Sequence, residues 1–152
     1  MRFHILAGTL VLSLIGSAAA LAGSQGGASA KPDLVVSSIS SPDRVAFQGN
    51  GFRVFDRTRN IGGGTARATR TQYYLSARGD RTAVGRRSVA RLAPHRSSTG
   101  SAAASVPVTV EAGIYSLVAC ADSAGAAKET RELNNCRIAT TKFLVKKPPP
   151  RV

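Results

Sequence analysis

Short runs of alternating apolar and polar residues, separated by turn-forming residues, make up the centre of this 152-residue chain. In segment 52–60, for example, Phe52 and Val54 alternate with arginines, which is the period of a half-buried strand. No segment shows a sustained helical period. The pattern predicts an all-β chain, a seven-stranded immunoglobulin-like β-sandwich. The expected strands are Leu34–Ile39, Phe52–Asn60, Thr69–Ser76, Val84–Leu92, Ser98–Val108, Gly113–Asp122 and Arg137–Val145.

One position interrupts the apolar side of segment 52–60. The alternation places Asp56 on the same side as Phe52, Val54 and Thr58, which is the side expected to face the core. A buried carboxylate needs a partner such as a nearby arginine. A β-bulge, which would turn Asp56 outward and shift the register, is the alternative.

The two cysteines lie in the last two expected strands. Because Tyr115 and Leu117 share one face of their strand, Cys120 points to the other face, and its partner is expected on the neighbouring strand of the same sheet. We predict a Cys120–Cys136 disulfide, which closes a loop of about 15 residues and contributes about 3 kcal/mol. A metal site or a nucleophile is less favoured, since two thiols are too few soft ligands. Tyr115, shortly after Gly113, also suggests a tyrosine corner.

The ends of the chain are typical of an exported protein. Residues 1–22 combine Arg2, an apolar stretch of 11 residues and then small residues, which predicts a signal peptide cleaved after Ala20 or Ala22. The apolar stretch is too short to span a membrane. Residues 23–31 are expected to be a linker, 32–145 the domain and 146–152 an extended Lys/Pro-rich tail. We therefore expect a secreted protein, or one in the periplasm or at the cell surface.

A series of short motifs, weak singly, follows in order along the chain: Lys31–Val36, Phe52-x-Val54 with Asn60-x-Gly62, Tyr73–Ser76, Gly85-x-Arg87-x-Val89, Leu92–Pro94, Ser97-Ser98-x-Gly100, Gly113-x-Tyr115-x-Leu117 and Glu129-x-x-Glu132-x-Asn134-Asn135. In their order and spacing these motifs resemble CARDB, the cell-adhesion-related domain found in bacteria. The resemblance covers about residues 32–145 and implies a seven-stranded sandwich of exported proteins with no assigned catalytic residues. Asp56 departs from it, because similar domains usually carry a small or apolar residue there.

Candidate chemistry is sparse. The segment 122–135 brings together oxygen ligands that could suit Ca²⁺, but Lys128 and Arg131 interrupt them and the spacing matches no known calcium loop. We favour a turn at Asp122 and hydrogen bonds from two asparagines to the loop backbone. Neither a metal nor a cofactor is predicted, and the absence of a recognisable nucleophile–base pair argues against an enzyme. The oxygen-bearing residues are Asp122, Glu129, Glu132, Asn134 and Asn135.

Charge is the remaining signal. Without Arg2 the chain carries 20 basic and 8 acidic residues, a net charge of +12, and segment 53–96 holds 11 arginines against two aspartates. Such an excess attracts polyanions, namely anionic cell-wall polymers, acidic polysaccharide or nucleic acid. Arg70, Arg86 and Arg87 are the predicted contacts; the alternative is an ordinary solvated surface. Two function classes remain: an adhesion module for an unknown surface protein or glycan, and an electrostatic polyanion binder.

Overall fold

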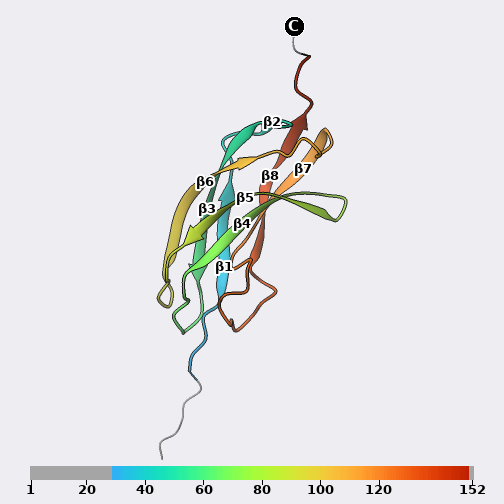
Figure 1. Cartoon of the computed structure of the whole chain (residues 1–152). Helices are drawn as coiled ribbons and strands as arrows, with labels where there is room; N and C mark the ends of the chain where they lie inside the picture. The colour runs from blue at the N-terminus through green and yellow to red at the C-terminus, as the bar shows by residue number, and fades with distance from the viewer. Residues whose placement is uncertain (1–28, 151–152) are drawn as a thin grey trace, which may run out of the picture.

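The protein folds into two β-sheets packed face to face, as the computed structural model of residues 29–150 shows (Figure 1). Its all-β class and sandwich architecture confirm the sequence-based prediction, but there are eight strands where seven were expected. They are β1 (Leu34–Ser40), β2 (Val45–Phe47), β3 (Gly51–Asn60), β4 (Thr69–Ala77), β5 (Asp80–Val89), β6 (Ser97–Ser105), β7 (Gly113–Cys120) and β8 (Cys136–Lys146).

The smaller sheet has three strands in the order β1-β3-β6, and the larger has five in the order β2-β8-β7-β4-β5. All pairings are antiparallel except that of β2 with β8. The core lies between the sheets, and its largest fully buried side chains include Tyr73, Leu34, Leu75 and Leu117. The first and last described segments leave the sandwich at opposite ends (Figure 1).

The unpredicted strand is β2. It has only three residues and pairs in parallel with the end of β8, from Val45 opposite Leu144 to Phe47 opposite Lys146. Turn-forming residues stand on both sides of it, Pro42-Asp43 before and Gly49-Asn50-Gly51 after. A run this short carries no readable alternation, so only its pairing with β8 defines it as a strand.

The alternative, a bulge at Asp56, is not present. β3 alternates exposed and buried residues over its whole length and pairs with β6 without interruption from Gly51 to Arg59. Asp56 is therefore buried, as the alternation predicted. The register irregularity of this sheet lies instead in β1, between Val36 and Ser38.

Other strand ends differ from prediction by a few residues. β5 begins at Asp80, four residues early, because Arg78 and Gly79 alone form the hairpin turn. Both have positive φ, 52° and 94°, which is the conformation of the tight hairpin turns that match strand twist. β6 ends at Ser105, three residues earlier than expected, and β7 ends at Cys120.

The predicted signal peptide (1–22), with cleavage after Ala20 or Ala22, lies outside the described residues, as does most of the 23–31 linker. β8 continues through Lys146, one residue into the predicted tail, and residues 147–150 are exposed. No helix among the described residues is long and apolar enough to cross a bilayer. Because the expected signal peptide lies outside the described residues, export stays a prediction.

Candidate functional site

The most concentrated polar chemistry lies inside the sandwich, where Asp56 of β3 meets Arg87 of β5. The Arg87 guanidinium donates through Nε (2.8 Å) and Nη2 (2.7 Å) to the two carboxylate oxygens of Asp56. The Asp56 side chain is fully buried and that of Arg87 is 11% exposed. The two residues come from different sheets, so this bidentate ion pair joins the sheets through the core.

Four further side chains take part in the network: Tyr73, Thr58, Thr71 and Ser98, whose Oγ accepts from Arg87 Nη1 at 3.0 Å. Tyr73 Oη and Thr58 Oγ1 donate to Asp56 at 2.6 and 3.0 Å, and Thr58 also shares a hydrogen bond with Thr71. Burial, reinforced by the hydrogen bond to Asp56 and its negative charge, raises the pKa of Tyr73. The Asp56 hydrogen bond raises the pKa of Arg87. Each polar group of this network has a hydrogen-bond partner within it. A fully satisfied buried network of this kind makes the packing of the two sheets rigid, and we call this role bracing.

Two glycines make room for this bracing. A Cβ on Gly100 of β6 would stand 2.8 Å from Cδ of Arg87, across the path of that side chain to Asp56. A Cβ on Gly85 of β5 would stand 2.9 Å from the carbonyl oxygen of Ala103. The edges of the two sheets can therefore approach closely at β5 and β6 only because these positions lack a side chain.

The three predicted polyanion contacts do not lie together. Arg87 points inward and is bound to Asp56, so its guanidinium does not present a free surface charge. Arg70 and Arg86 are exposed on the outer face of β4 and β5, where Arg70 pairs with Ser88 and Arg86 with Gln72. Alternation explains the split, since neighbours on a strand face opposite ways.

A second group of arginines gathers on the other sheet. Arg53, Arg57 and Arg59 all lie on the outer, solvent-exposed side of β3, the central strand of the three-stranded sheet. Phe55 stands in the same row and is 43% exposed. The alternation of segment 52–60 had already placed these arginines on one side. What the sequence did not indicate is that this side is the middle of an open face.

Apart from Val35 opposite Arg59, the residues on either side of this row are small. Outward neighbours of Arg57 are Ser38 on β1 and Thr99 on β6, and those of Phe55 are Ser40 and Ser101. Within residues 29–150 the Arg87–Asp56 pair is the one salt bridge, so none of these exposed arginines is neutralised by a carboxylate. An acidic residue, Asp43, accepts from the backbone N–H of Arg53 at 3.3 Å.

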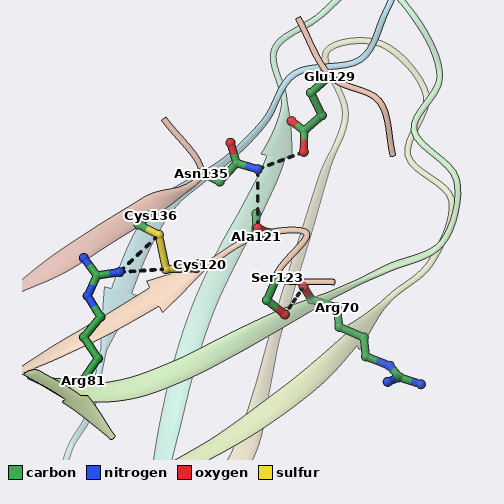
Figure 2. The surroundings of a disulfide bond; sticks show 8 residues. All are labelled: Arg70, Arg81, Cys120, Ala121, Ser123, Glu129, Asn135 and Cys136. Atoms are coloured by element: carbon green, nitrogen blue, oxygen red, sulfur yellow. Dashed lines mark hydrogen bonds between the residues drawn. A yellow bond between two sulfur atoms is a disulfide. The ribbon is translucent and has the colours of Figure 1, made fainter. Parts of the chain in front are cut away.

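The disulfide is confirmed and lies on the outer face of the five-stranded sheet. Cys120 of β7 and Cys136 of β8 are directly opposite in register, with an S–S distance of 2.05 Å. The bridge thus joins neighbouring strands, as the parity of Cys120 predicted. Figure 2 shows the Arg81 guanidinium directed at the bridge, with Nη1 3.7 and 3.8 Å from the two sulfurs. The predicted tyrosine corner is also present: Tyr115 Oη donates to the carbonyl oxygen of Glu111 at 2.9 Å.

The acidic loop uses its oxygens internally. The Asp122 carboxylate accepts from the N–H groups of Ala126 (2.9 Å) and Ala127 (2.8 Å), which confirms the predicted turn. The buried Glu129 accepts from Asn135 Nδ2 at 2.9 Å (Figure 2). It also accepts from the backbone N–H of Leu34. It ties the loop to the start of β1.

The loop asparagines do less backbone capping than predicted. Asn135 Nδ2 reaches the carbonyl oxygen of Ala121 at 3.5 Å, but Asn134 Nδ2 donates instead to the side chain of Asp33 at 2.8 Å. Glu132 accepts from the backbone N–H of Glu129. Across residues 29–150 no three His, Cys, Asp or Glu side chains are placed to hold a metal ion together.

Comparison with protein families supports the resemblance noted from the motifs. The CARDB family profile matches residues 31–139, most of the chain and nearly all of the sandwich. The chain belongs to the CARDB family. A search of curated proteins finds no match.

Solved CARDB structures share the fold. The CARDB domain of the PF1109 protein from Pyrococcus furiosus, crystallised in complex with di-metal ions, is 22% identical, with a TM-score of 0.55 over 78% of this chain and 96% of that one. A domain of a Methanosarcina acetivorans protein thought to lie at the cell surface is also 22% identical, with a TM-score of 0.54 over 79% of this chain and 95% of its own. At this identity the likeness shows the fold alone. The metal ions are a property of the Pyrococcus domain.

Proposed function

We propose that this CARDB domain is a non-catalytic binding or adhesion module that acts outside the cytoplasm. The buried carboxylates of Asp56, Asp122 and Glu129 all accept hydrogen bonds from other groups of the domain, and so they serve its structure. What remains for a partner is the exposed surface of two rigid sheets. Sheets braced by an ion pair and a disulfide suit binding that depends on a preformed surface.

The test is binding of the purified, fluorescently labelled domain to intact cells of the producing bacterium. Binding should saturate, should be displaced by an excess of unlabelled domain, and should persist at high salt, because a shaped protein or glycan contact is only weakly screened. Binding that is non-saturable would contradict this function. Prior treatment of the cells with protease or periodate then distinguishes a protein partner from a glycan.

A second candidate, an electrostatic polyanion binder, is supported by the row Arg53, Arg57 and Arg59. Three exposed guanidinium groups on one sheet face, without carboxylate partners, concentrate positive charge on a rigid support. Binding of this kind weakens steeply with salt, in contrast to the first candidate. Retention on heparin and on DNA resin at low salt, with elution of both over the same salt range, would support it. Failure to bind either resin at low salt would exclude it.

A further inference from the structure

We infer that the outer face of the β1-β3-β6 sheet is a contact surface for single-stranded nucleic acid, with Phe55 as the stacking platform. This inference rests on the electrostatic candidate above and adds to it a place and a ligand class. It is carried by the combination of unpaired arginines, an exposed aromatic ring and small flanking residues on one face.

The row on β3 has the dimensions of an extended polymer. Residues two apart on a strand are about 6.8 Å apart, so the row from Arg53 to Arg59 extends over about 20 Å. Its charge is greatest at the Arg57–Arg59 end, because Asp43 lies beside the backbone of Arg53 at the other end. A guanidinium group binds phosphate in bidentate geometry and keeps its charge at every relevant pH.

The flanking strands favour an elongated ligand that lies along this row. Serine and threonine side chains on β1 and β6 are short, so the arginines and Phe55 project above them. Their hydroxyl groups can donate to phosphate oxygens, a common backbone contact in nucleic-acid complexes. Two of these serines already form hydrogen bonds with β3. Ser37 Oγ donates to the carbonyl oxygen of Arg57, and Ser101 Oγ accepts from Arg53 Nη1.

Phe55 decides between ligand classes. A phenyl ring 43% exposed between guanidinium groups offers a π-face to a base, and base–aromatic stacking adds to backbone contacts in proteins that bind single strands. The bases of a duplex are stacked on one another and cannot reach a flat sheet. A sulfated or uronic polysaccharide has no aromatic plane, so Phe55 would contribute to it only as apolar surface.

The experiment measures fluorescence anisotropy of a labelled oligothymidylate against salt concentration for the wild-type domain and four variants. Arg57→Gln/Arg59→Gln removes two charges from the proposed face. Arg70→Gln/Arg86→Gln removes two exposed charges from the opposite sheet and is the matched control. Phe55→Ala removes the ring, whereas Phe55→Leu keeps an apolar side chain without a π-face. Unfolding midpoints, measured for all variants, ensure that only folded proteins are compared.

We expect the Arg57/Arg59 variant to lower the slope of log K against log salt by about 1.4, since each phosphate contact on a single strand contributes about 0.7. The Arg70/Arg86 control should keep the wild-type slope. Both Phe55 variants should bind the oligothymidylate about tenfold more weakly, within the range for loss of one stacked base.

Four results would overturn the inference, and they differ in which function they leave supported. Equal loss in the two arginine variants would refute this face but keep a diffuse electrostatic function. Phe55→Leu binding as well as wild type, or heparin competing more strongly than the oligonucleotide at equal charge, would replace nucleic acid by an anionic polysaccharide. A wild-type domain that ignores oligonucleotide and heparin alike at low salt would exclude the electrostatic function itself.

Discussion

Replacing Asp56 with alanine tests whether the buried ion pair braces the two sheets. The change removes a carboxylate that accepts four hydrogen bonds, two from Arg87 and one each from Tyr73 and Thr58. It leaves the Arg87 guanidinium in the core with no anion to face. For a buried carboxylate with no partner, removal would instead be neutral or stabilising, so the sign of the effect is informative.

The structure sets the expected size. Breaking a buried ion pair by removing one partner typically costs about 3–5 kcal/mol. Arg87 keeps 11% of its side chain exposed and can recover some hydration, which favours the lower end of that range, whereas the Tyr73 hydroxyl, left without its acceptor, adds about 1 kcal/mol. We therefore expect a loss of about 3–4 kcal/mol, a large part of the 5–15 kcal/mol by which a domain of this kind is usually stable.

The assay is denaturant unfolding followed by far-ultraviolet circular dichroism, because the chain has no tryptophan. The control is Asp56→Leu/Arg87→Met, which removes both charges and should restore stability to within about 1 kcal/mol of wild type or above it. A loss below about 1 kcal/mol for Asp56→Ala, or a double variant no more stable than the single one, would refute the bracing role.

Three further predictions concern other parts of the sandwich. The native protein should show no free thiol until reduced, and Cys120→Ser should lower the unfolding free energy by about 2–4 kcal/mol; two reactive thiols in native protein would contradict this. Burial raises the pKa of Glu129 to about 7, so the folded state binds its proton more tightly, and the stability from that proton is complete below about pH 4.5 and lost as the pH rises through 7. Glu129→Gln should flatten this decline in pH-dependent unfolding, and an unchanged profile would show that another group causes it. Gly85→Ala should lower the thermal midpoint and cost about 1–3 kcal/mol, since its Cβ would stand 2.9 Å from the Ala103 carbonyl oxygen; wild-type stability would mean that the β5–β6 edges separate easily.

Features that depend on local pattern could be predicted from the sequence. The alternation of segment 52–60 correctly placed Asp56 inside, and the parity of Cys120 correctly placed its disulfide partner on the neighbouring strand. Both follow from the two-residue period of a strand, which holds wherever the strand packs. The same reasoning, applied to Arg86 and Arg87, would have separated these two neighbours onto opposite faces.

Features that depend on which strands meet could not be predicted in this way. Nothing local to Arg87 indicates that its inward side chain would find Asp56, 31 residues earlier, because that contact requires β5 and β3 to face each other across the core. Short β2 was missed for a similar reason, since its only strand-like property is its pairing with the distant β8.

The sequence alone therefore determined the class of this protein: an all-β CARDB sandwich with one disulfide and a strongly basic composition. The tertiary structure decided which of its charges are structural and which face solvent. It assigned Arg87 to the core and the row on β3 to an open face. The physical reason is that charge and periodicity are properties of single strands, whereas burial and ion pairing arise only when two sheets pack together.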